Sequence, residues 1–164
     1  MRIVIGVMGG AIVDDAAAEN ARRLGELIAE RGWVLLNGGR NAGVMAASAR
    51  GASEAGGLVV GLLPGDTCSN AAPHLDVAIP TGLGDARNAI NVLASRVVVA
   101  LPGGAGTVSE VALALKAGRT VVMLGFPLGQ PFTSFYERGQ LVDAATPEEA
   151  VEFVTRALGG GEAP

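Results

Sequence analysis

Residues 101–110, LPGGAGTVSE, combine three glycines with Thr107 and, three positions later, Glu110. Glycines let backbone N–H groups approach a ligand closely, so the segment could hold a phosphate beside a reactive carboxylate. The same letters also match the capping box, in which Thr107 caps a helix and Glu110 bonds back to the Thr107 N–H. Both interpretations, a catalytic Glu110 and a helix-capping Glu110, remain open from the sequence.

Two further glycine-rich segments follow apolar runs, at residues 6–10 (GVMGG) and 37–43 (NGGRNAG). Three such turns at three strand ends predict a nucleotide- or phosphate-binding site, since ligands bind beyond the carboxyl ends of parallel strands. The residues expected to bind the ligand are Gly9, Gly10, Gly38, Gly39, Gly43, Gly103, Gly104, Gly106 and Thr107.

Arg87 and Asn88 open the helical pattern that follows PTGLGD and should lie near the same edge. The planar guanidinium of arginine suits phosphate or carboxylate, so we expect both residues to contact the ligand.

Other kinds of chemistry are disfavoured. The sequence contains neither G-x-G-x-x-G in the first turn nor a P-loop, and its only lysine, Lys116, lies within a helical pattern, which argues against a Schiff-base decarboxylase. With one Cys and one His, no internal disulfide or Cys/His zinc site can form, and no metal site is expected. Cys68 and His74 fall in the 64–75 segment, a surface loop or a lid, and Cys68 is not expected to be a nucleophile.

The elements that must position these residues alternate regularly. Continuous apolar runs predict buried parallel strands at residues 2–7, 33–37, 57–63, 76–79, 96–101 and 120–125, with a weaker one at 139–144. Helical patterns occupy residues 14–32, 43–57, 85–95, 107–118 and 146–159. The expected fold is therefore α/β: a Rossmann-like, doubly wound, mainly parallel sheet of six or seven strands, with helices on both faces. We expect one domain over residues 1–158 and a flexible tail at 159–164.

Composition limits the partners. The 164 residues carry a net charge of −4, which argues against non-specific nucleic-acid binding. No apolar run approaches the ~20 residues of a membrane span, and the start lacks a signal-peptide pattern. We expect a cytoplasmic protein that contacts neither nucleic acid nor membrane.

Four segments carry a resemblance to a known family: NGGRNAGVMAASARGA, GLLPGD, IPTGLGDARN and LPGGAGTVSEVALAL. Over about residues 1–125 they resemble the Rossmann-like superfamily of the Lonely Guy phosphoribohydrolases, once mislabelled lysine decarboxylases. The PTGLGDARN segment is most similar to a sister branch of short bacterial and algal proteins that includes the molybdenum cofactor carrier proteins.

The resemblance implies roles for individual residues. In the phosphoribohydrolases, the residues matching Arg87 and Glu110 act on the N-glycosidic bond of a nucleoside 5′-monophosphate, and the turn matching Thr107 binds the phosphate. Those enzymes typically have a lysine where this chain has Asn88, and Gly-Leu-Met-Gly where it reads Gly43-Val44-Met45-Ala46.

Two functions are therefore expected. The preferred one is a carrier that binds a phosphorylated small molecule, such as molybdenum cofactor, without a cofactor needed for folding. The alternative is a phosphoribohydrolase that uses Arg87 and Glu110 on nucleoside monophosphates. A third class, a regulatory protein that senses a nucleotide, has no specific support in the sequence. The resemblance also implies a homo-oligomer, a dimer or a tetramer.

Overall fold

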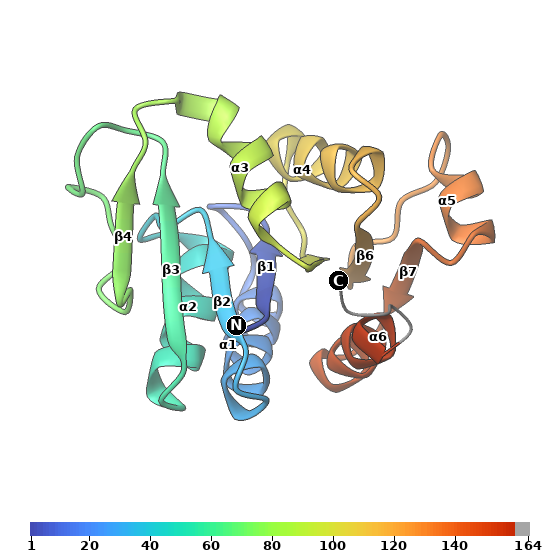
Figure 1. The fold of residues 1–164 in the computed structure, drawn as a ribbon, viewed down its shortest axis with the longest axis horizontal. Helices are drawn as coiled ribbons and strands as arrows, with labels where there is room; N and C mark the ends of the chain where they lie inside the picture. The colour runs from blue at the N-terminus through green and yellow to red at the C-terminus, as the bar shows by residue number, and fades with distance from the viewer. Residues whose placement is uncertain (160–164) are drawn as a thin grey trace.

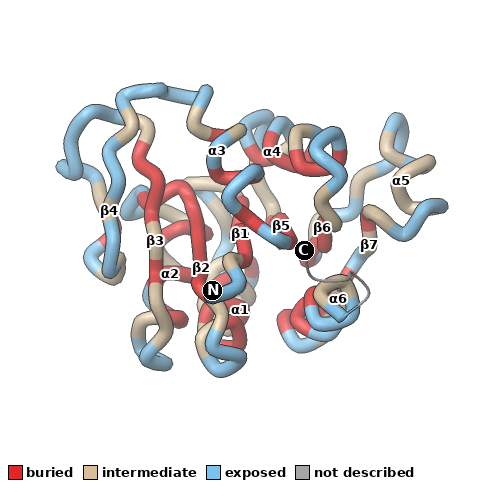
Figure 2. Tube along the Cα trace, in the orientation of Figure 1, coloured by how far each residue is buried: buried red, intermediate tan, exposed pale blue. Residues whose placement is uncertain are grey.

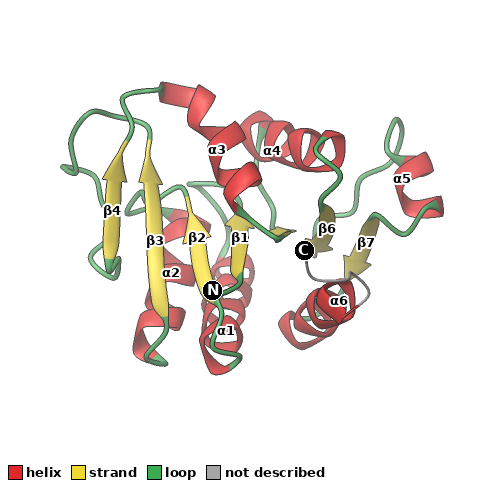
Figure 3. Ribbon diagram, in the orientation of Figure 1, coloured by secondary structure: helices red, strands yellow, loops and turns green. Residues whose placement is uncertain are grey.

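The computed structural model describes residues 1–159 and contains one seven-stranded sheet in the order β4-β3-β2-β1-β5-β6-β7 (Figures 1 and 3). Every strand pair is parallel, so the predicted α/β class and the weaker seventh strand are both confirmed. The strands are β1 (Val4–Met8), β2 (Val34–Asn37), β3 (Leu58–Leu63), β4 (Val77–Pro80), β5 (Val97–Ala100), β6 (Thr120–Leu124) and β7 (Leu141–Ala144).

Helices cover both faces of this sheet. They are α1 (Asp15–Glu30), α2 (Gly43–Glu54), α3 (Arg87–Ala94), α4 (Ala105–Lys116), α5 (Thr133–Glu137) and α6 (Pro147–Gly159). Alternate residues of β5 point to opposite faces: Val97 and Val99 join one hydrophobic cluster with α1, α2 and α6, whereas Val98 joins another with α3 and α4. The central strands are buried as a result (Figure 2).

The chain changes direction across the sheet at β1. Successive strands run outward from β1 to β4, and the chain then returns to β5 on the other side of β1. In such a sheet the β1–α1 and β5–α4 turns diverge at the carboxyl edge and leave a crevice at the switch point. The glycine-rich ends of β1 and β5 meet there.

Two predicted boundaries need correction. The helix expected from Thr107 begins two residues earlier, at Ala105, and Gly104 occupies the N-cap position without any side-chain bond. Gly159, expected to start the tail, closes α6, and the rest of the predicted tail lies outside the described residues. The short helix α5 was not predicted.

Within residues 1–159, no helix has the length and apolar character that crossing a membrane requires.

Helices α1 and α2 pack closely through glycines. A Cβ at Gly25 would collide with the Ser48 carbonyl, and a Cβ at Gly51 would collide with the Arg22 carbonyl. The Ala-rich composition of α2 is thus explained by its contact with α1, which brings the start of α2 to the edge that carries the glycine turns.

We expect Gly51→Ala to lower the free energy of unfolding by about 1–3 kcal/mol, because backbone atoms of α1 must move to admit the methyl group. Urea denaturation would measure it. The control is Gly159→Ala, where a Cβ meets nothing within 4 Å. Equal stability of the two variants would contradict the close helix contact.

Candidate functional site

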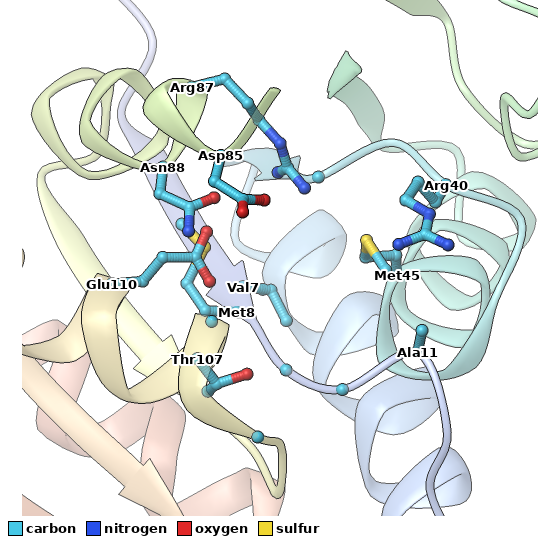
Figure 4. A pocket seen from close by; sticks show the side chains of 15 residues that line it. Val7, Met8, Ala11, Arg40, Met45, Asp85, Arg87, Asn88, Thr107 and Glu110 are labelled. Atoms are coloured by element: carbon cyan, nitrogen blue, oxygen red, sulfur yellow. The ribbon is translucent and has the colours of Figure 1, made fainter. Parts of the chain in front are cut away.

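A cavity of about 210 Å³ opens at the carboxyl edge of the sheet, between the β1–α1 turn, the β2–α2 turn and the first residues of α3 and α4 (Figure 4). Its lining includes nine of the residues predicted from the sequence: Gly9, Gly10, Gly38, Arg87, Asn88, Gly104, Gly106, Thr107 and Glu110. The predicted residues Gly39, Gly43 and Gly103 do not line it. The structure therefore brings residues from four separate segments around one space.

The glycine turns hold one another in place. The Gly10 N–H donates to the Pro102 carbonyl over 2.9 Å, and the Gly10 carbonyl accepts from the Val44 N–H over 3.0 Å. Gly43 has a φ of +47°, and a Cβ there would collide with the Gly10 carbonyl. A Cβ at Gly103 would collide with the Thr107 hydroxyl. Gly43 and Gly103 thus allow the turns to pack closely and do not form the surface of the cavity.

Asn37, at the end of β2, fixes the second turn. Its Nδ2 donates to the Met45 carbonyl over 2.9 Å and to the Ser48 hydroxyl over 3.1 Å, and its Oδ1 accepts from the Gly39 N–H over 2.8 Å. The side chain is fully buried. The three hydrogen bonds use three of the four donor and acceptor positions of its amide group. Gly39 itself has a φ of +70° and packs against Gly61.

The start of α4 presents open backbone to the cavity. A Cβ added at Gly104 or Gly106 would meet nothing within 4 Å. The N–H groups of the first turn have no carbonyl partner inside the helix, and no side chain caps them. Together with the positive end of the helix dipole, they favour an anion at this position.

Of the two interpretations left open for Glu110, the capping box does not match the structure. Thr107 lies inside the first turn of α4 and is buried, and Glu110 turns toward α3, where it accepts a hydrogen bond from Asn91 Nδ2 over 3.1 Å. Asn88 also faces α4, donating from Nδ2 to the Ser109 hydroxyl over 3.3 Å. The contact between α3 and α4, which the local sequence pattern does not reveal, decides where these side chains point.

Glu110 is a buried carboxyl group, with only 7% of its surface exposed. Burial raises its pKa from the usual 4.5, and the bond from Asn91 and the charge of Arg87 oppose that rise. Asn91 Oδ1 is buried without a partner within residues 1–159. The carboxyl group is thus maintained at the cavity at a cost to stability, which is common for functional residues.

We expect Glu110→Gln to raise the free energy of unfolding at pH 7 by ~0.5–2 kcal/mol. The neutral amide can still accept the hydrogen bond from Asn91, and its burial does not remove a charge from water. A group whose pKa is raised by folding stabilises most below its unfolded value, and that contribution is lost as pH rises through the folded value.

The stability gap between Glu110→Gln and the parent should therefore widen as pH rises from 4 through the raised pKa, and denaturation across pH would measure it. Glu137→Gln, at an exposed position on α5, is the control. A gap that stays constant with pH would contradict this account of Glu110.

Arg87, the first residue of α3, extends its guanidinium over Gly38, where any Cβ would collide with it. Its Nε is buried without a hydrogen-bond partner among the described residues. Burial lowers the pKa of Arg87, the nearby charge of Arg40 lowers it further, and Glu110 and Asp85 act in the opposite direction. Gly38 is therefore required for the position of Arg87.

Several lining residues were missed by sequence reasoning: Val7, Met8, Ala11, Arg40, Met45 and Asp85. Arg40 could have been found, because it stands between two predicted glycines in NGGRNAG. Asp85 likewise lies two positions before Arg87. Cys68 is exposed and does not line the cavity, and His74 lines a neighbouring groove with Asn41 and Gly43.

A doubly wound parallel sheet with a glycine-bordered cavity at its switch point defines a Rossmann-like protein. This chain belongs to the SLOG cluster4 family, whose model matches residues 2–151. The predicted resemblance to the Lonely Guy superfamily, and to its branch of molybdenum cofactor carriers, is thereby confirmed.

Similar proteins support the same placement. A protein of Archaeoglobus fulgidus is 45% identical over 151 residues, covering 91% of this chain and 92% of its own length. The molybdenum cofactor binding protein of Rippkaea orientalis superposes with a TM-score of 0.91 at 45% identity, covering 96% of this chain and 98% of that one. The molybdenum cofactor carrier protein of Chlamydomonas reinhardtii gives 0.87 at 42% identity, covering 97% and 99%.

Proposed function

We propose that this protein is a carrier that binds molybdenum cofactor, a pterin with a terminal phosphate, in the cavity at the switch point. The observation that carries the proposal is the uncapped start of α4, where Gly104 and Gly106 leave the N–H groups open to the cavity. The phosphate would lie there beside Thr107, in the cavity that Gly9, Gly10 and Gly38 also line. The names of the two similar solved proteins agree with this ligand.

Retention of cofactor tests the proposal. The purified protein would be mixed anaerobically with molybdenum cofactor released from a molybdoenzyme, passed over a desalting column, and assayed for bound molybdenum and for protection of the pterin from oxidation. We expect retention well above that of a control protein of similar size and charge. Retention equal to the control would exclude the carrier function.

One observation favours a second function. Arg87 and Glu110, the pair implied in N-glycosidic cleavage, both line the cavity. A phosphoribohydrolase would use Glu110 to stabilise developing positive charge on the ribose, with Arg87 assisting. Asn88 stands in the place of the lysine of those enzymes and binds Ser109 instead. Release of free base from AMP, lost in Glu110→Gln, would establish this function in place of the carrier.

We also propose that the chain forms a homo-oligomer. Large apolar side chains are exposed on β4 (Val77 and Ile79) and on α3 and the turn before it (Leu83, Ile90 and Leu93). An apolar surface of this kind is covered in most stable proteins. Light scattering would distinguish a dimer or a tetramer from a monomer, and a monomer at micromolar concentration would contradict the proposal.

A further inference from the structure

Two arginines converge on one side of the cavity from different elements. Arg40 comes from the turn between β2 and α2, and Arg87 from the start of α3. Both line the cavity, and Figure 4 shows both guanidinium groups directed into it, on the side away from Thr107. The backbone of Gly38 runs beneath the Arg87 side chain, so a bulkier residue there would displace the guanidinium.

Arg40 and Arg87 form no ion pair within the described part of the chain. Within residues 1–159, four arginines pair with a glutamate (Arg22, Arg23, Arg50 and Arg156) and the others do not, so what distinguishes Arg40 and Arg87 is the cavity that both of them line. Asp85, exposed at the cavity rim, favours the charged form of Arg87 but does not pair with it.

Arg40 and Arg87 repel each other across this space, whereas Glu110, whose charge acts on Arg87 more strongly than that of Arg40, attracts it. An anion placed between the two arginines would remove the repulsion and supply the partner that Arg87 Nε lacks. A guanidinium pair presents several N–H groups in fixed planes, which suits a compact oxyanion.

The start of α4 is a separate anion-binding position. In Figure 4, Thr107 and the first turn of α4 lie on the opposite side of the cavity from Arg40. The two positions therefore lie on different sides of the cavity.

We infer that the ligand carries two separate anionic groups, a phosphate bound at the start of α4 and a second oxyanion bound between Arg40 and Arg87. The inference rests on the proposed binding of a phosphorylated ligand at α4. The second group has the chemistry of a phosphoryl group or of a metal oxyanion. A nucleoside 5′-monophosphate, with one anionic group, leaves one of the two positions empty, so the arginine pair selects against such ligands.

Nuclear magnetic resonance of ¹⁵N-labelled protein tests the inference. Inorganic phosphate and molybdate would be titrated separately, with sodium chloride at matched ionic strength as the blank. We expect two groups of signals to shift and saturate: the backbone amides of residues 104–107, and the Nε–H signals of Arg40 and Arg87. Tighter saturation of the arginine signals by molybdate than by phosphate would identify the second group as a metal oxyanion, and the reverse order would identify a phosphoryl group.

The variant Arg40→Gln separates the two positions. In it, we expect the anion affinity reported by Arg87 Nε–H to fall about ten-fold, while the affinity reported by residues 104–107 changes less than about two-fold. The matched control is Arg96→Gln, which removes the same charge from an exposed position at the opposite end of β5.

The outcomes distinguish this inference from the proposed function. If amides 104–107 respond but the arginine signals do not, or respond equally in Arg40→Gln, the second anion position is excluded and the phosphate site stands. If the arginine signals alone respond, the phosphate site at α4 is excluded, and the two-anion inference falls with it. If neither group responds beyond the chloride blank, both are excluded.

Discussion

Gly106→Leu is expected to weaken ligand binding by at least ~100-fold, about 2.7 kcal/mol, while the protein folds as stably as the parent. Gly106 lines the cavity, and a Cβ there meets no protein atom within 4 Å. The leucine side chain would therefore project into ligand space without disturbing the core. Leucine also has a higher helix propensity than glycine, by about 0.8–1 kcal/mol in a helix interior, which favours the fold of α4.

Two measurements are needed for Gly106→Leu: the urea midpoint, and retention of released molybdenum cofactor. The matched control is Gly159→Leu, since Gly159 is also a helical glycine with open space around it, at the far end of α6. We expect the control to retain cofactor as the parent does. Full retention by Gly106→Leu would show that the ligand does not lie against the start of α4.

The parallel sheet could be predicted because its signal is local. Runs such as VVVA in β5 and VLLN in β2 are buried at every position, and only a strand covered on both faces needs a continuous apolar sequence. The glycine turns follow those runs directly, so the sequence also predicts that Gly9, Gly38 and Gly106 lie at one edge of the sheet.

The parts that sequence missed depend on contacts between distant segments. The TVSE pattern left a cap and a catalytic carboxylate open for Glu110, and only the packing of α3 on α4 reveals its hydrogen bond with Asn91. Arg40 lies in a turn, where no periodicity indicates the direction of a side chain. The five residues of α5 are too few for a helical pattern to be distinguished from a turn.

Buried polar groups at and beside the cavity lower the stability of the fold. Glu110 is buried, Asn91 Oδ1 and Arg87 Nε lack partners within residues 1–159, and Arg87 faces Arg40. Unsatisfied buried polar groups lower stability by roughly 1–3 kcal/mol each. Of the residues with such atoms, Arg87 lines the cavity, where a ligand would supply the missing partner, whereas Asn91 and Arg119 do not line it.

Arg87→Met should make the protein more stable without ligand and weaken its binding of the ligand. Methionine keeps much of the unbranched apolar stem but removes the partly buried guanidinium that lies over Gly38, so we expect the free energy of unfolding to rise by ~0.5–2 kcal/mol. In the same variant, ligand affinity should fall by ~100-fold or more, because a partly buried charge that pairs with an anionic ligand is lost. Urea denaturation without ligand and a binding titration with released molybdenum cofactor would measure the two effects.

If Arg87 serves ligand binding, the free energy of unfolding should rise and the ligand affinity should fall in Arg87→Met. An arginine that served the fold would, on removal, lower stability and leave binding intact, and that result would refute its assignment to the site. Arg96→Met is the control, since Arg96 is exposed and lies before β5 at the other edge of the sheet, so neither quantity should change appreciably. Added ligand should then stabilise the parent and the control in proportion to the logarithm of its concentration above Kd, and leave Arg87→Met almost unchanged.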